Sequence, residues 1–125
     1  MTLPAPSAPR ASIDSLADCR SLVNAFYARV REDPLLDPVF AARIPDQAWP
    51  EHLERMAAFW YTVLFGVPLF HGDPRGKHRP LPITWQHYER WLSLWASTVY
   101  SLFEGPRAEE AKARAARMAK VLSAQ

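Results

Sequence analysis

The sequence lacks several features that define other classes of protein. Its 125 residues include a single cysteine, Cys19, so no disulfide can form within the chain and nothing depends on an oxidising compartment. No apolar run approaches the roughly 20 residues that a membrane-spanning helix needs. The net charge is only +2 and the basic residues are scattered, which gives no basis for nucleic-acid binding. We therefore expect neither a membrane nor a nucleic acid as partner.

Motifs of the common enzyme classes are also missing. The chain has no glycine-rich phosphate loop, no paired-cysteine metal site and no hydroxyl nucleophile motif. His71 and His78 could contribute to a zinc site, but only Asp73 lies nearby as a further ligand, so a zinc site is not favoured.

The composition is that of one globular domain, with 49% apolar and 22% charged residues. Residues 1–11 contain three prolines and three alanines and are expected to form a disordered tail, which leaves residues 12–125 as a single domain. The first residues are too polar and too rich in proline for a signal peptide, which favours the cytoplasm.

Proline and glycine divide this domain into helices. Ser12 or Asp14 can cap a first helix that runs to about Glu32, where Asp33-Pro34 ends it because the residue before proline is pushed out of the α region. Asp37-Pro38 follows at once and leaves room only for a turn.

Three further helices are predicted along the rest of the chain. One starts near Asp46 and ends at Gly66, one follows Thr84 as its cap, and the last covers about 107–123. Glu110 and Arg114 on the last helix are spaced to form an ion pair. The loop 66–82 shows no periodicity, and no segment alternates as a strand would, so the predicted fold class is all-α.

A few polar residues are candidates for chemistry. His78 lies in the loop before an aromatic helix, as a ligand of a flat apolar cofactor would, although a lone loop histidine is more often solvated. Tyr27, His52 and Trp91 each bring a hydrogen-bond donor to an apolar helical stripe. Core packing is the ordinary interpretation of each, but a bound ligand would also supply the partner that a buried donor needs. His87 falls on the polar side of its helix and is expected to be solvated.

In combination, these residues resemble the truncated haemoglobins, specifically group III. The glycine pairs typical of the first two groups are missing, and group III is the group that lacks them. The matching pieces, from Phe26 to about Leu122, are Phe26-Tyr27, Phe40, Trp49-x-x-His52, Phe59-Trp60, Gly72-x-Pro74-x-x-x-His78-x-x-Leu81 and Glu89-Arg90-Trp91-Leu92.

The resemblance implies a shortened globin whose helices pack two over two around haem b. His78 would be the proximal ligand of the iron. Tyr27, His52 and Trp91 match the family's distal polar residues, which donate hydrogen bonds to bound O₂ and favour it over neutral CO. The residues expected to form the apolar slot around the macrocycle are Phe26, Phe40, Met56, Phe59 and Tyr88.

Several details of the implied site stay open. Lys77, Arg75 or Arg79 could pair with the haem propionates. Phe70 stands where the family often has tyrosine, which puts a hydrogen bond from that position in doubt. His52 could itself bind ferric iron when no other ligand is present.

The implied function is binding of O₂, and of NO and CO, at ferrous haem iron. The polar distal residues suggest tight retention of O₂, or chemistry on O₂, NO or peroxide that would require a reductase. A cofactor-free helical interaction domain, and a haem sensor or carrier, remain alternatives.

Overall fold

The computed structural model describes residues 10–70 and 83–123 of the chain. Within these ranges the only β-type pairing is an isolated bridge between Ala11 and Phe103, so the all-α prediction is confirmed. The helices are α1 (Leu16–Val30), α2 (Asp37–Ala41), a 3₁₀ turn η1 (Asp46–Ala48), α3 (Trp49–Phe65), α5 (Trp85–Leu102) and α6 (Pro106–Ser123).

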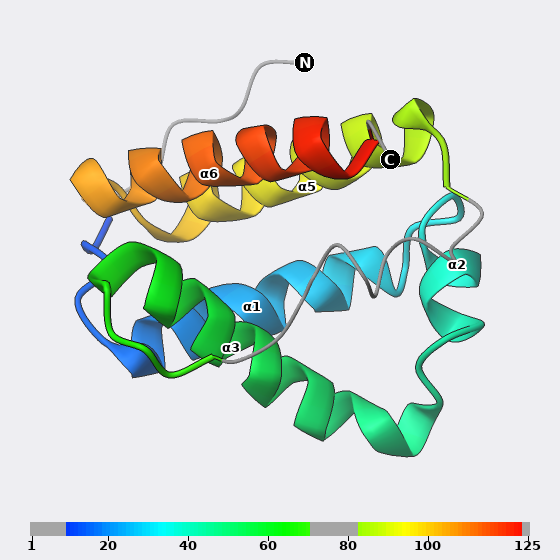
Figure 1. The fold of residues 1–125 in the computed structure, drawn as a ribbon, viewed down its shortest axis with the longest axis horizontal. Helices are drawn as coiled ribbons and strands as arrows, with labels where there is room; N and C mark the ends of the chain where they lie inside the picture. Colours follow the sequence, from blue (N-terminus) through cyan, green and yellow to red (C-terminus); the bar gives the residue numbers. More distant parts are fainter. Residues whose placement is uncertain (1–9, 71–82, 124–125) are drawn as a thin grey trace.

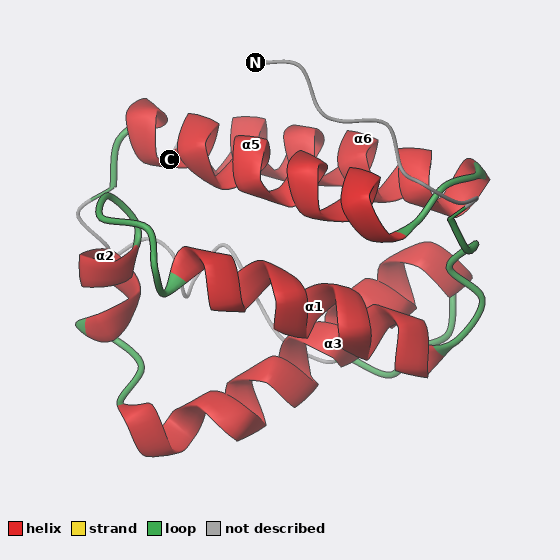
Figure 2. Cartoon of the chain, turned by 180° about the vertical axis from the view of Figure 1, so that it is seen from behind, coloured by secondary structure: helices red, strands yellow, loops and turns green. Residues whose placement is uncertain are grey.

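The four long helices form two layers (Figures 1 and 2). α5 and α6 lie side by side in one layer, and α1 and α3 pack against each other in the second. α1 also contacts α5, so it joins the two layers, while the short α2 stands at one end of the molecule. This is the two-over-two arrangement that the resemblance to the truncated haemoglobins implies.

α1 is the central helix because its apolar residues repeat at helical spacing. Leu22, Val23, Phe26 and Val30 are all buried in the core. The N-cap is Ser15, whose side-chain oxygen accepts a hydrogen bond from the Asp18 backbone N–H at 3.1 Å. The helix thus begins later than the caps Ser12 or Asp14 would place it. Cys19 is buried on the same helix, and burial raises the pKa of its thiol to about 11.

The corner after α1 is closed by a buried carboxylate. The Asp33 side chain, only 3% exposed, accepts hydrogen bonds from the backbone N–H groups of Leu35 and Leu36 and from Arg90 Nε at 2.6 Å. Burial alone would raise the pKa of this carboxyl, but the Arg90 guanidinium and the two N–H groups more than compensate and hold it below its ordinary value. The corner is therefore tied to α5.

We expect Asp33→Asn to lower the free energy of unfolding at neutral pH by about 1 to 3 kcal/mol, because a charged acceptor is lost. Since the folded pKa is depressed, the carboxylate stabilises the fold above the unfolded pKa of 3.8, and this stabilisation is lost as pH falls through the lower folded pKa. Urea unfolding at neutral pH and at a pH of about 2 measures both effects. Glu89→Gln is the control. A difference from wild type that stayed the same at both pH values would contradict a role for the charge.

The second Asp-Pro pair, Asp37-Pro38, was expected to break the chain and to leave room only for a turn before Val39-Phe40. Asp37 and Pro38 instead form the first turn of α2, where proline is tolerated because its missing N–H has no partner within the helix. The prediction was wrong because an Asp-Pro pair fits a helix start as well as a helix end. The consequence is that Phe40 is placed by a helix rather than by a turn.

The remaining helix ends follow the predicted signals. Gly66 ends α3 in the left-handed conformation, with φ of 72°, which favours glycine. Thr84 precedes α5, and its backbone N–H donates to Nδ1 of His87 at 3.1 Å. The Trp95 indole N–H donates to the carbonyl oxygen of Ala111 at 3.0 Å and joins α5 to α6.

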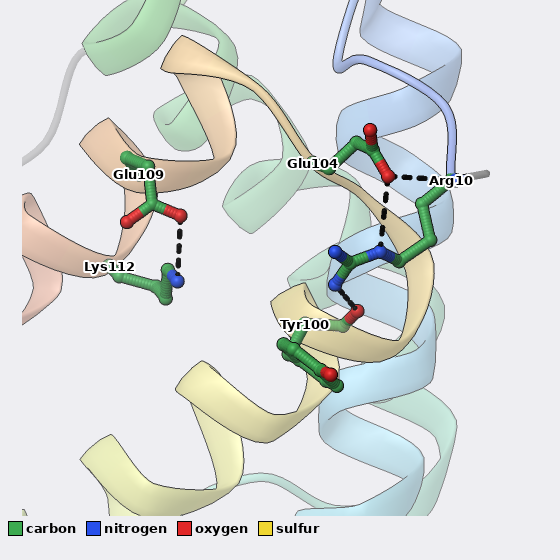
Figure 3. A network of polar contacts seen from close by, with 5 residues as sticks. All are labelled: Arg10, Tyr100, Glu104, Glu109 and Lys112. Carbon is green, nitrogen blue, oxygen red and sulfur yellow. Dashed lines mark hydrogen bonds and ion pairs between the residues drawn. The ribbon is translucent and has the colours of Figure 1, made fainter. Parts of the chain in front are cut away.

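The first described residues are attached to the turn between α5 and α6 (Figure 3). Arg10 donates its backbone N–H and its Nε to the carboxylate of Glu104, and its guanidinium also reaches the carbonyl oxygen of Tyr100. Arg10 and Ala11 were expected in a disordered tail, but these contacts and the bridge between Ala11 and Phe103 hold them to the domain. Residues 1–9 of that predicted tail lie outside the described part of the chain.

Ion pairs between neighbouring turns cover the outer face of α6. Lys112 Nζ lies 2.8 Å from Glu109 Oε2 (Figure 3), and Arg114 Nε lies 2.6 Å from Glu110 Oε1, which confirms the pair predicted at that spacing. Among the helices of the described residues, none is both long enough and apolar enough to cross a bilayer.

Candidate cofactor-binding cavity

A cavity of about 420 Å³ lies between the two helix layers. Residues from α1, the α2 region, α3, α5 and α6 line it, so its shape depends on the packing of the whole domain. The volume falls in the range of roughly 300–1,000 Å³ that is usual for small-molecule and cofactor sites.

The three hydrogen-bond donors selected from the sequence line this cavity, each from a different helix. They are Tyr27 on α1, His52 on α3 and Trp91 on α5. The rings of Tyr27 and His52 meet edge to face, with centroids 5.4 Å apart. The structure therefore brings together the three polar residues that the sequence analysis selected.

Two of the donors have no partner within the described residues. No hydrogen bond of the Tyr27 hydroxyl or of the Trp91 indole N–H to residues 10–70 or 83–123 is present. Burial raises the pKa of the Tyr27 hydroxyl well above its ordinary value, so the phenol keeps its proton and remains a donor. Tyr27 is buried and Trp91 is half-buried, and both line the cavity, so both donors are available to a bound ligand.

The apolar wall contains most of the residues expected there. Phe40, Met56, Phe59 and Tyr88 all line the cavity. Phe26 does not, which differs from the expectation. It is 1% exposed and lies behind the wall, with its ring centroid 4.9 Å from Tyr27 and 5.8 Å from Trp91. Phe26 thus supports two of the donors from behind instead of facing the cavity.

The lining also includes cationic residues that the sequence analysis missed. Arg43 and Arg55 line the cavity, and no aspartate or glutamate does so among the described residues. Arg55 follows His52 by three positions, so helical spacing could have placed it on the same face. In the structure, Nη2 of Arg55 lies 3.3 Å from Oε1 of Glu51, whose side chain is largely exposed.

His87 was expected to be solvated on the polar side of its helix, but it lines the cavity. Its Nδ1 accepts the Thr84 N–H, so a neutral ring carries its proton on Nε2. The capping bond therefore fixes the ring beside the cavity, an effect that helical periodicity does not predict.

The predicted iron ligand cannot be placed. His78 and the candidate propionate partners Lys77, Arg75 and Arg79 lie outside the described residues, as does His71. What the described residues offer is a cavity with apolar walls, two arginines, and polar rings that include Tyr27, His52 and Trp91. This combination fits a ligand with a large apolar body and anionic groups at its edge, as haem has.

An all-helical, two-layer domain with such a cavity has the architecture of a small globin, and comparisons with known proteins agree. The sequence profile described as "Bacterial-like globin" matches residues 12–123. The chain therefore belongs to the bacterial-like globin family.

Individual relatives are truncated hemoglobins of group 3 and of group 2. The chain is 35% identical over 81 residues to the group 3 truncated hemoglobin ctb of Campylobacter jejuni, a match that covers 62% of this chain and 64% of that protein. It is 38% identical over 77 residues to the group 2 truncated hemoglobin YjbI of Bacillus subtilis, which covers 58% and 54%. Both matches span less than two thirds of the relative's length.

The fold agrees over a longer stretch. The crystal structure of a group III truncated hemoglobin from Campylobacter jejuni superposes with a TM-score of 0.84 at 26% identity, over 91% of this chain and 92% of that one. The predicted resemblance to the group III truncated haemoglobins is thereby confirmed.

Proposed function

We propose that this chain binds haem b in the cavity and uses Tyr27, His52 and Trp91 to stabilise a diatomic ligand on the haem. The observation that supports this most directly is the convergence of three donors, from three helices, on one apolar cavity. When bound, the haem supplies an iron atom that takes a gas molecule such as O₂, NO or CO, with His78 as the protein ligand.

The chain's own residues would then act by orientation and by excluding water. Phe40, Met56 and Phe59 provide apolar surface against the macrocycle. The phenol, imidazole and indole would donate hydrogen bonds to a ligand that carries partial negative charge, and in a water-poor cavity such bonds are strong. Tight retention of O₂ follows, as does chemistry on O₂, NO or peroxide if a reductase supplies electrons.

Arg43 and Arg55 are the described residues best suited to the haem propionates. Each is a cation on the cavity lining, and guanidinium groups bind carboxylates through paired hydrogen bonds. For Arg55, binding a propionate would mean exchanging its contact with Glu51, which is largely exposed and so contributes little.

Titration of the purified protein with haemin tests the proposal. We expect a saturable complex with a sharp Soret band that shifts when dithionite and then CO are added. The double variant Arg43→Gln and Arg55→Gln should release haem to apomyoglobin several-fold faster than wild type, because two partly exposed ion pairs of roughly 0.2–1 kcal/mol each are lost. Arg20→Gln, which removes an ion pair with Glu54 away from the cavity, is the control.

The cofactor-free interaction domain predicts a different outcome of the same titration. Folded protein would show no saturable Soret band, and the two arginine substitutions would not affect haem at all. A haem sensor or carrier would bind haem but lose it readily to apomyoglobin even as wild type.

A further inference from the structure

Trp49 lies directly behind the polar side of the cavity. It is the first residue of α3, is 4% exposed and does not itself line the cavity. Its ring centroid lies 5.6 Å from that of Tyr27 and 5.4 Å from that of His52. A third contact, with Phe40, spans 6.5 Å. Trp49 thus touches cavity residues on α1, α2 and α3.

A second group holds Trp49 from the other side. The guanidinium carbon of Arg31 lies 4.7 Å from the centroid of the Trp49 ring. Nη2 of Arg31 is in turn 3.2 Å from Oδ1 of Asp46, the first residue of η1. Asp46 is almost fully exposed, so the ion pair adds little energy, but it orients the guanidinium over the indole.

These contacts restrict the movement of His52. The ring of His52 meets Trp49 at 89° and Tyr27 at 77°, so two large rings occupy two of the directions in which it could turn. Closely packed interiors leave few voids, so another rotamer of His52 on that side requires displacement of the indole. The Tyr27 ring is confined by the same indole.

We propose that Trp49 is a positioning residue that fixes the rings of His52 and Tyr27 and so determines how long a ligand is retained in the cavity. The proposal rests on the proposed function for its effect on the ligand, but not for its effect on the two rings. Trp49 contacts cavity residues on three separate elements. A residue that served core packing alone would not be expected to have its ring contacts with these cavity residues.

The first test concerns the rings themselves, in the protein as purified. Nuclear Overhauser contacts between Tyr27 and His52 should be strong in wild type, weaker in Trp49→Phe and lost in Trp49→Leu. Leu22→Ala is the matched control, because it leaves a gap in the buried core that does not border the cavity. Contacts that survived in Trp49→Leu, or that disappeared equally in Leu22→Ala, would overturn the proposal.

The second test measures ligand retention in the haem-loaded protein. We expect the O₂ dissociation rate of Trp49→Leu to be at least about threefold higher than that of wild type, because residues in direct contact are energetically coupled. The rate of Trp49→Phe should lie between the two. In a His52→Ala and Tyr27→Phe background, the same Trp49→Leu change should alter the rate by less than about twofold. An undiminished effect in that background would overturn the proposal.

The two tests separate this proposal from the proposed function. If wild type bound no haem, the proposed function would fail, yet the nuclear Overhauser contacts would still decide whether Trp49 positions the two rings. If haem bound normally and the contacts were insensitive to Trp49, only the positioning role would fail.

Discussion

Replacement of His78 by alanine is expected to change the haem complex more than any other single substitution in this chain. The Soret band should lose its histidine-ligated form. Haem affinity should fall by more than the roughly 10- to 100-fold that removal of an outer-shell partner costs, because the role proposed for His78 is to bind the iron directly. Absorption spectra of the ferric, ferrous and CO-bound states of wild type and His78→Ala measure both effects.

Two further variants make the result specific. In His78→Gly, added imidazole should restore a spectrum close to that of wild type, since a free ring can occupy the vacated volume. His71→Ala, which removes the other histidine of the predicted loop 66–82, should have no effect. Equal effects of His71→Ala and His78→Ala would contradict ligation by a single histidine and would instead support a metal site to which both residues contribute.

The helices were predictable because their signals are local. Pro34 after α1, Gly66 after α3 and Thr84 before α5 each act within one turn of backbone, and the structure places helix ends at all three. Asp37-Pro38 failed as a signal because proline at a helix start and proline after a helix end look alike in sequence. The corner before α2 is held by the buried Asp33 carboxylate, which accepts hydrogen bonds from Leu35, Leu36 and Arg90, and these contacts are not visible in the sequence.

The donor trio could be selected from sequence, since a polar ring on an apolar stripe is visible in the residue spacing. The residues that support these donors could not be selected from the sequence. Phe26 satisfies the same periodicity as Tyr27, and only the packing of α1 against α3 and α5 decides which ring faces the cavity. Arg43 lies between α2 and η1, where no periodicity applies. Trp49 was part of the recognised pattern, but its contacts join elements that are separate in sequence.

Removal of the Tyr27 hydroxyl, which we propose donates to the bound gas, is the second change with a large expected effect. In Tyr27→Phe, O₂ should dissociate about 10 to 150 times faster than from wild type, which corresponds to the roughly 1.5–3 kcal/mol of a hydrogen bond to a charged acceptor. Trp91→Phe should act in the same direction. Dissociation of CO, which carries little charge for a donor to stabilise, should change by much less in both variants. Stopped-flow displacement of each gas measures these rates.

The fold should tolerate the tyrosine change well. Because the Tyr27 hydroxyl has no partner among the described residues, its loss removes a buried polar group without leaving another unsatisfied, and the free energy of unfolding should stay within about 1 kcal/mol of wild type. Tyr61→Phe and Trp85→Phe are matched controls, since neither residue lines the cavity and Trp85 is largely exposed.

The comparison of O₂ with CO decides between two physical causes of retention. If hydrogen bonding holds the ligand, the two donor variants accelerate O₂ and spare CO. If the rings instead act as a steric barrier, the isosteric Tyr27→Phe leaves both rates nearly unchanged, and the smaller ring in Trp91→Phe accelerates both gases alike. Unchanged O₂ rates in both variants would remove the donor argument, and His52, with the Trp49 side chain behind it, would be the remaining source of retention.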